Sequence, residues 1–275
     1  MMIRTLAALA TLTLAPLGLT SVSLADDPAT EAALEPLADR FARGFYARDA
    51  EQVLSTVHPE LSKLGLRPNF QGRGRMVIEN LTPGDLQVLG ELYNADGHLD
   101  PITSTVDVRF FDSTADTGVF QLTADTDWYD FFVGTRINGE WTLVNCAYGG
   151  YGWIDNPGRA DDMRMIGELV ETYAAAWDAG DAETVTASVY PDFDRRHVDR
   201  SGTREFLAPE TLETIAIHLD ETGAADTPST VTVFEATQMT GAARIDAANR
   251  TEWIFLLRVA GEWEIVNSFW EPRRA

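Results

Sequence analysis

The stretch GEWTLVN at residues 139–145 recurs as GEWEIVN at residues 261–267, an offset of 122 positions. Nearer the start of each copy, ARDAEQVLSTVHPEL at residues 47–61 aligns with AGDAETVTASVYPDF at residues 179–193, with seven of fifteen positions identical. Two matches in the same order indicate an internal duplication. The turn-rich residues Asp155-Asn156-Pro157-Gly158 predict the linker. We therefore expect domain 1 to cover residues 26–155 and domain 2 residues 156–275.

Each copy begins with helical signals. Apolar residues at helical spacing are Leu34, Leu37, Ala38, Phe41 and Phe45 in the first copy and Ile166, Leu169, Val170, Tyr173 and Trp177 in the second. Asp49 and Asp181 have the side chain for an N-cap of a second, short helix. A third helix is expected to open at Thr82-Pro83 in the first copy and at Ala208-Pro209 in the second.

Strand signals make up the rest of each copy. A short strand is expected between the second and third helices, at residues 61–66 and 193–198. The later strands are expected at 103–112, 118–124, 127–137 and 140–148, and at 229–238, 241–246, 251–259 and 262–270. Turns at Asn138-Gly139 and Ala260-Gly261 join the last two strands of each copy as hairpins. Helices followed by an antiparallel meander predict two α+β domains, each with helices packed on one face of a curved sheet.

The N-terminus has the pattern of a bacterial export signal. Arg4 precedes an apolar stretch at residues 6–22, and Ser23-Leu24-Ala25 supplies the small residues of a cleavage site. We expect a signal peptide over residues 1–25, export to the periplasm or the medium, and no membrane attachment after cleavage. An uncleaved anchor is the alternative, but the stretch is short for a membrane span.

Charge and cysteine content exclude several classes of function. The chain has 21 Lys and Arg against 43 Asp and Glu, a formal charge of −22. Such a surface repels phosphate backbones, so we expect no nucleic-acid partner. Cys146 is the only cysteine and can form neither an internal disulfide nor a cysteine-based zinc site. No phosphate-binding or dinucleotide motif is present, so no cofactor is expected.

A metal site is not expected either. Asp192, Asp194, His197 and Asp199 crowd one stretch, but strand alternation divides them between two faces. Ligands on opposite faces of a strand do not converge on one ion.

The order of these motifs resembles the NTF2-like superfamily, and within it the branch known as lumazine-binding. His58-Pro59-Glu60-Leu61-Ser62-Lys63 matches the helix end of that branch, and Trp270-Glu271-Pro272-Arg273 matches its closing strand. The first copy departs from the closing pattern after Asn145. The resemblance implies cone-shaped domains with a pocket between helices and sheet, and it implies no particular chemistry. Superfamily enzymes such as ketosteroid isomerases and polyketide cyclases place a carboxylate base and acid donors in this pocket.

Several residues are candidates for the pocket. The catalytic candidates are His58 and Asp130, and the expected ligand contacts are His58, Lys63, Tyr93, Trp128, Tyr190, Arg195 and Glu252. Asp127, Asp192 and Arg250 are further candidates for pocket chemistry.

Each candidate also has a structural interpretation. His58 and Tyr190 precede a proline where a ring can plug the cone, and this packing role is favoured. Lys63, the only lysine, aligns with Arg195, and both are expected to pair with an acid on the neighbouring strand rather than bind an anionic ligand. The strand acids Asp127, Asp130 and Glu252 are expected on a solvated face. Asn145 and Asn267 are expected to bond to the backbone, on the same strand faces as Leu143 and Ile265.

Three functions follow from these interpretations. The favoured one is an exported protein that binds a small apolar or aromatic molecule, or a protein partner, without catalysis. It rests on the expectation that the two copies share scaffold residues but no acid–base pair. The alternative is an isomerase, dehydratase or cyclase acting from the domain 1 pocket. The third is a purely structural pair whose sheets pack together as an internal pseudo-dimer, so that the chain is a monomer in solution.

Overall fold

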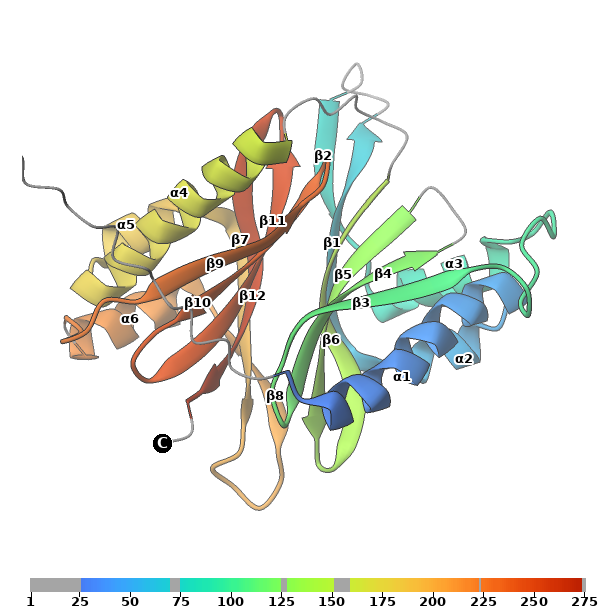
Figure 1. The fold of residues 1–275 in the computed structure, drawn as a ribbon, viewed down its shortest axis with the longest axis horizontal. Coiled ribbons are helices and arrows are strands. Elements are labelled where there is room, and N and C mark those ends of the chain that lie inside the picture. The colour runs from blue at the N-terminus through green and yellow to red at the C-terminus, as the bar shows by residue number, and fades with distance from the viewer. Residues whose placement is uncertain (1–25, 70–74, 125–127, 151–158, 223, 274–275) are drawn as a thin grey trace, which may run out of the picture.

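The computed structural model describes residues 26–69, 75–124, 128–150, 159–222 and 224–273 (Figure 1). The expected signal peptide over residues 1–25 and the domain boundary after Asp155 lie outside these residues, so both remain predictions. Among the described residues, no helix is long and apolar enough to cross a membrane.

Two copies of one element order make up the chain. In domain 1 the elements are α1 (Pro28–Ala47), α2 (Ala50–Leu54), β1 (Val57–Asn69), β2 (Arg75–Asn80), α3 (Pro83–Leu92), β3 (Val106–Ser113), β4 (Thr117–Ala124), β5 (Trp128–Ile137) and β6 (Glu140–Gly150). In domain 2 they are α4 (Arg159–Ala179), α5 (Ala182–Ala187), β7 (Val189–Asp199), β8 (Phe206–Glu210), α6 (Leu212–Thr222), β9 (Thr230–Ala236), β10 (Thr240–Asp246), β11 (Arg250–Val259) and β12 (Glu262–Pro272). The expected duplication and α+β class are confirmed.

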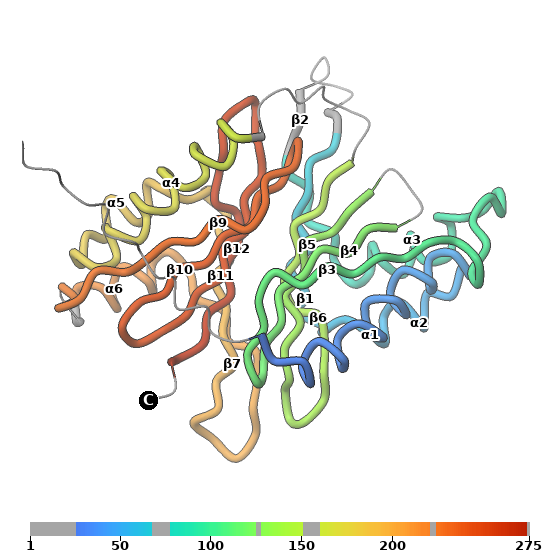
Figure 2. Tube along the Cα trace, in the orientation of Figure 1, coloured from blue at the N-terminus to red at the C-terminus, as the bar shows by residue number. Residues whose placement is uncertain are grey.

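Each domain has one six-stranded sheet, in the order β2-β1-β6-β5-β4-β3 or β8-β7-β12-β11-β10-β9. The first strand of each pairs in parallel with the last, and the other pairs are antiparallel. Figures 1 and 2 show the two sheets facing each other in the middle of the molecule, with α1–α3 outside one sheet and α4–α6 outside the other. The chain is therefore an internal pseudo-dimer of four layers.

The helix starts follow from the predicted capping residues. Asp49 Oδ1 accepts from the backbone N–H of Gln52 at 2.9 Å, and Asp181 Oδ1 accepts from that of Thr184 at 3.0 Å. Thr82 and Asp85 form a capping box at the start of α3. Both residues of each predicted hairpin turn have positive φ, 52° and 86° at Asn138 and Gly139.

One predicted helix start is wrong. Residues 206–210 form strand β8, and α6 begins at Leu212 after a cap by Thr211, whose Oγ1 accepts from the Thr214 N–H at 3.2 Å. Pro209 lies on β8, the edge strand of its sheet, and pairs with Arg196 of β7. An edge strand tolerates proline because one row of its N–H groups has no ladder partner. Strands β2 and β8 were both absent from the sequence-based expectation.

The facing sheets share an apolar core that belongs to both domains. It includes Phe131 and Val133 of domain 1 and Trp253 and Phe255 of domain 2, all at most 1% exposed. Phe111 stacks on Phe234 across the interface, with ring centroids 5.6 Å apart. Burial of this much aromatic surface from both sheets holds the two domains together.

The asparagines that end the repeated GEWxxVN stretch bond across the interface. Asn145 Nδ2 donates to the Ser268 carbonyl at 3.0 Å, and Asn267 Nδ2 donates to the Cys146 carbonyl at 3.2 Å. Ser268 and Cys146 are themselves equivalent positions, so the two bonds are related by the pseudo-twofold symmetry. The predicted backbone-bonding role of both amides is confirmed.

The predicted face of these asparagines is wrong. A β-bulge shifts the register between Val133 and Gly134, which leaves Val144 as an extra residue on β6. Leu143 therefore packs on the helices, whereas Val144 joins the interface core and Asn145 bonds across it. A bulge inserts one residue and so inverts the face of those that follow.

Asp112 is a buried polar group that bonds across the interface. Its carboxylate accepts from Trp253 Nε1 at 2.7 Å and from Arg244 Nη1 at 2.9 Å, both in domain 2. The residue is 2% exposed. In a second ion pair across the interface the carboxylate comes from domain 2, where Glu235 pairs with Arg109 of domain 1.

Candidate functional site

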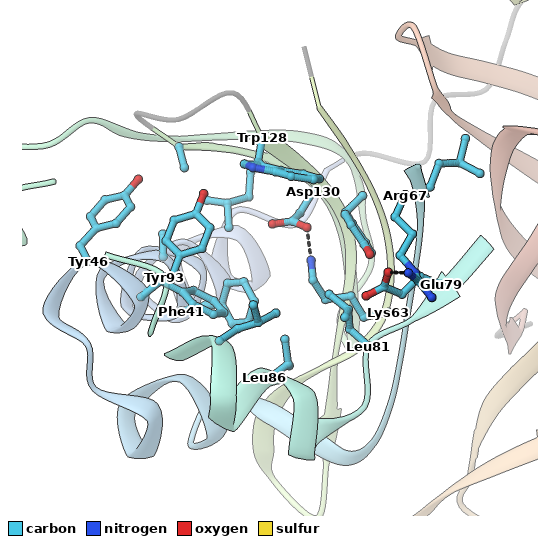
Figure 3. Close-up of a pocket in the computed structure, with 17 residues that line it drawn as sticks. Phe41, Tyr46, Lys63, Arg67, Glu79, Leu81, Leu86, Tyr93, Trp128 and Asp130 are labelled. Atoms are coloured by element: carbon cyan, nitrogen blue, oxygen red, sulfur yellow. Dashed lines mark hydrogen bonds and ion pairs between the residues drawn. The ribbon is translucent and has the colours of Figure 1, made fainter. Parts of the chain in front are cut away.

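A cavity of about 230 Å³ opens between the helices and the sheet of domain 1 (Figure 3). Most of its wall is apolar or aromatic, from Phe41, Ala42, Phe45, Tyr46, Leu66, Leu81, Leu86, Leu89, Tyr93, Leu122, Ala124, Trp128 and Tyr148. The charged residues in the wall are Lys63, Arg67, Glu79 and Asp130. A mostly apolar cavity with a few polar groups is the usual form of a small-molecule site.

Three strands bring the polar group at the sheet wall together. Lys63 of β1 pairs laterally with Cys146 of β6, and Cys146 pairs with Phe132 of β5. Asp130 lies two residues before Phe132 and therefore on the same face of β5. Lys63 Nζ donates to Asp130 Oδ1 and lies 3.3 Å from Cys146 Sγ.

The Lys63 side chain is only 6% exposed, and that of Asp130 is 17% exposed. Lys63 Nζ lies 4.6 Å from the ring centroid of Tyr148 and 5.2 Å from that of Phe132. Figure 3 shows the second carboxylate oxygen of Asp130 directed away from Lys63, toward the space beside Tyr93. The ion pair thus presents both a donor and an acceptor at the cavity.

Electrostatics keep Lys63 charged in this apolar setting. Burial alone would lower its pKa, but attraction to Asp130 and hydrogen bonds to Asp130 and Cys146 outweigh it, so the pKa of Lys63 is raised. Burial raises the pKa of the Cys146 thiol well above its ordinary value. Burial also raises the pKa of Tyr148. At neutral pH Lys63 is therefore an ammonium, Cys146 a thiol and Tyr148 a phenol.

Both cations pair with strand acids, as predicted, but only Arg195 has an acid on a neighbouring strand, Glu210 of β8. The partner of Lys63 is Asp130 of β5, and strand β6 lies between β1 and β5. In domain 2, Arg195 occupies the place of Lys63 and Glu252 that of Asp130, with Arg195 Nε 2.9 Å from Glu252 Oε1. The expectation that Asp130 and Glu252 lie on a solvated face is wrong, because both pair inside the cone of their domain. Each copy thus has one ion pair at equivalent positions of its cone, Lys63–Asp130 and Arg195–Glu252.

Domain 2 surrounds its pair with further partners. Arg195 and Glu252 have side chains 3% and 0% exposed. Glu252 also accepts from Arg250 at 3.1 Å, from Ser268 at 2.8 Å and from Tyr173 at 3.2 Å. Burial opposes its charge, but the two arginines and these hydrogen bonds lower the pKa of Glu252 to about 2.

Aromatic and arginine side chains fill the cone of domain 2. The Arg195 guanidinium lies 4.6 Å from the Trp177 ring and 4.9 Å from the Trp270 ring, and Arg250 also lies 4.6 Å from Trp177. The equivalents of Trp177, Trp270 and Arg250 in domain 1 are Phe45, Tyr148 and Trp128, all of which line the open cavity.

Gly65 explains part of this difference. A Cβ atom at Gly65 would lie 2.2 Å from the Tyr148 ring, so only glycine lets that ring lie against β1. The equivalent residue in domain 2 is His197, whose ring packs 4.5 Å from Trp270. An aromatic ring therefore lies over the buried cation in both domains, but beside it stands a glycine in domain 1 and an imidazole in domain 2.

Three predicted ligand contacts, Lys63, Tyr93 and Trp128, line the cavity together with the catalytic candidate Asp130. His58 does not, because its Nδ1 accepts from the backbone N–H of Glu60 at 3.1 Å and its charged neighbours are Glu60 and Arg196 of domain 2. His58 is half-buried at the domain boundary, so it neither plugs the cone nor reaches the ligand cavity. Just before His58, the backbone of Val57 pairs with Leu143 of β6. The register of β1 against β6 then shifts between Val57 and Ser62, and this irregularity directs His58 away from the cone.

The domain 2 candidates have other roles. Tyr190 packs against the core between the sheets rather than inside the cone. Arg195, Arg250 and Glu252 belong to the buried ionic network, and Asp192 is exposed. Asp127 lies outside the described residues.

Sequence analysis missed several residues of the cavity. Arg67 and Glu79 form an ion pair between β1 and β2 in its wall, and β2 was not predicted. Tyr46 and Tyr148 also line it. Tyr148 aligns with Trp270 in the closing strands of the two copies. This match between two aromatic residues could have indicated a shared place in the cone.

No protein-family model matches the chain, and no curated protein matches it. Solved structures that it resembles include an NTF2-like protein of unknown function from Shewanella baltica, with 16% identity and a TM-score of 0.39 over 44% of this chain and 100% of that one. An NTF2-like protein of unknown function from Silicibacter pomeroyi matches with 16% identity and a TM-score of 0.36, over 42% and 98%. A ketosteroid isomerase-like protein from Erwinia carotovora atroseptica has 15% identity and a TM-score of 0.34, over 42% and 99%.

Each half of the chain has the α+β fold, with helices packed on one six-stranded sheet, that the sequence resemblance to NTF2-like domains implies. Helices that precede an antiparallel meander, and a cavity between helices and sheet, agree with what the sequence resemblance implies, whereas strands β2 and β8 are additions to it.

Proposed function

We propose that the protein binds one small apolar or aromatic molecule in domain 1 and that domain 2 is its structural partner. The observation that carries this proposal is the contrast between the open cavity of domain 1 and the side chains that fill the equivalent space of domain 2. A dry cavity of about 150 Å³ lined by aliphatic and aromatic residues holds benzene. A cavity of about 230 Å³ therefore suits a ligand of one or two rings.

We propose binding without catalysis because the charged groups of the cavity are already paired. Asp130 is bonded to Lys63, and Glu79 is paired with Arg67. Proton abstraction needs a base that is free to accept the proton and an acid at a separate pKa. Paired carboxylates of this kind support binding and orientation of a ligand better than turnover.

We also propose that the protein is exported, and this proposal rests on the sequence of residues 1–25 alone. Their charged start, apolar stretch and Ser-Leu-Ala ending support cleavage after Ala25 and function in the periplasm or the medium. N-terminal sequencing of the protein isolated from its host tests the cleavage site.

Naphthalene is a direct probe of the cavity. We expect isothermal titration calorimetry and native mass spectrometry to show one equivalent bound per chain, since Trp177, Trp270 and Arg250 occupy the cone in the described part of domain 2. Gly65→Ala should weaken this binding about 10-fold or more, because the new methyl group displaces the Tyr148 ring into the cavity.

The matched control is Gly167→Ala on α4. A Cβ there meets its nearest neighbour, Val233, at an ordinary 3.6 Å, so naphthalene affinity should stay that of the unmodified protein. Two equivalents per chain, or undiminished binding by the Gly65→Ala variant, would contradict the assignment of the site to domain 1.

A second candidate function is an isomerase, dehydratase or cyclase. The supporting observation is that the Asp130 carboxylate and the Tyr93 and Tyr148 side chains share one cavity. A carboxylate base near phenol donors is suited to proton transfer beside a carbonyl. His58 is no longer a candidate base because it lies outside this cavity.

The two functions give opposite results in a turnover assay. With a panel of unsaturated and hydroxylated ring ketones, followed by absorbance, we expect no turnover. If a ketone is converted and Asp130→Asn lowers kcat by about 100-fold or more while His58→Ala does not, the enzyme replaces the binding protein as the function.

A further inference from the structure

The charges in the domain 1 cavity sum to zero. Its wall carries two cations and two carboxylates, and they are paired as Lys63 with Asp130 and Arg67 with Glu79. A charged ligand entering this wall loses its hydration without gaining an unpaired counter-charge. The cavity therefore disfavours both carboxylates and ammonium ions as ligands, in spite of the four charged side chains in its wall.

The Lys63–Asp130 pair nevertheless has hydrogen-bonding capacity left. An ammonium has three N–H donors, and two of them have acceptors in Asp130 Oδ1 and Cys146 Sγ. The third lies among aromatic rings, which are weaker acceptors than a ligand oxygen. The second oxygen of Asp130 faces the cavity in Figure 3. A donor and an acceptor thus stand side by side at one end of an otherwise apolar cavity.

We propose that the ligand of domain 1 is an uncharged molecule of one or two rings with a hydroxyl group, which donates to Asp130 and accepts from Lys63. This inference rests on the proposed binding function and adds the chemical class of the ligand. A hydroxyl is both donor and acceptor, so it matches both members of the pair at once. The rings of Phe41, Phe45, Tyr93 and Trp128 then enclose the apolar body.

Burial of the Lys63–Asp130 pair is consistent with a role in recognition. A buried ion pair adds little stability over apolar packing, and its defined geometry is better suited to recognition. In domain 2 the equivalent pair is closed off by Arg250, Tyr173 and Ser268, which use up the acceptor positions of Glu252. In domain 1 the equivalents of Arg250 and Tyr173 are Trp128 and Phe41, so an indole replaces the guanidinium and a ring without a hydroxyl group replaces the phenol.

The test compares four probes of one size on the unmodified protein at pH 7: naphthalene, 2-naphthol, 2-naphthoate and 2-naphthylmethylammonium. We expect calorimetry to show 2-naphthol binding about 10- to 100-fold more tightly than naphthalene, which is the range for a hydrogen bond to a charged group. The anion and the cation should bind more weakly than 2-naphthol.

Each outcome separates the two proposals. If naphthalene binds at one per chain and 2-naphthol binds no more tightly, the hydroxyl inference is overturned while the binding function stands. If the anion or the cation binds most tightly, the inference is likewise overturned. If none of the four binds, the binding function itself fails and the inference falls with it.

A double variant assigns the preference to the ion pair. Lys63→Met with Asp130→Leu removes both charges together, so neither is left buried and unpaired. The ratio of naphthalene to 2-naphthol dissociation constants should fall to about one in this variant. Retention of the full ratio would show that another group recognises the hydroxyl, which overturns the assignment to Lys63 and Asp130.

Discussion

Glu252→Ala should lower the free energy of unfolding by about 3–5 kcal/mol, the usual result of removing one partner from a buried ion pair. The change deprives Arg195 and Arg250 of a carboxylate that is 0% exposed. For a chain of this size we expect the melting temperature to fall by roughly 6–20 °C. Differential scanning calorimetry measures the effect.

Glu168→Ala is the control for this prediction, since Glu168 pairs with Arg164 on the exposed face of α4. That variant should remain within about 0.5 kcal/mol of the unmodified protein. A similarly small effect of Glu252→Ala would mean that the network in domain 2 does not contribute to stability as described.

Acid titration gives a second readout of the same group. The pKa of Glu252 is about 2 when folded, below the ordinary value of 4.5. Its contribution to stability is therefore complete above about pH 4.5 and is lost as the pH falls toward 2. Glu252→Gln lacks this ionisation, so the stability difference between the two proteins should shrink across that interval.

Asp112→Ala should strongly destabilise the interface between the domains. It removes the acceptor of Trp253 Nε1 and one carboxylate partner of Arg244, both of which remain buried. Arg244 keeps its second partner, Asp246, so we expect a loss of about 3 kcal/mol and a fall of roughly 6–12 °C in melting temperature.

Asp39→Ala is the corresponding control, because Asp39 pairs with Arg43 within α1 and is 40% exposed. It should change the stability by no more than about 0.5 kcal/mol. Near-ultraviolet circular dichroism should also change in the Asp112 variant as Trp253 loses its hydrogen bond. An unaltered melting temperature and spectrum would show that the Asp112 contacts do not hold the sheets together.

Much of the fold was predictable because its signals are local. The caps at Asp49 and Asp181, the helical stripes and the hairpin turns depend on neighbours in sequence. Strands β2 and β8 were missed because edge strands carry little apolar alternation and can include proline, as at Pro209. The face of Asn145 was missed because a bulge is a property of strand pairing that no single strand encodes.

The site was predictable only in part. Lys63 was found as the only lysine, aligned with Arg195, but its partner Asp130 lies on β5, two strands away, rather than on the neighbouring strand. The cavity itself depends on how Gly65 and Tyr148 pack, which is a matter of volume in three dimensions. His58 was misplaced because the register of β1 decides which way it points.

The difference between Gly65 and His197 has a consequence for how the molecule tolerates change. A homodimer must place the same side chain in both cones, so any substitution that hollows one hollows the other. In this tandem chain the cone of domain 1 lacks the packing contacts of a side chain at Gly65, whereas domain 2 has them at His197. The two domains share one apolar core between their sheets. The second half can thus act as a stability reserve, leaving the first free to exchange the residues around its cavity as its ligand changes.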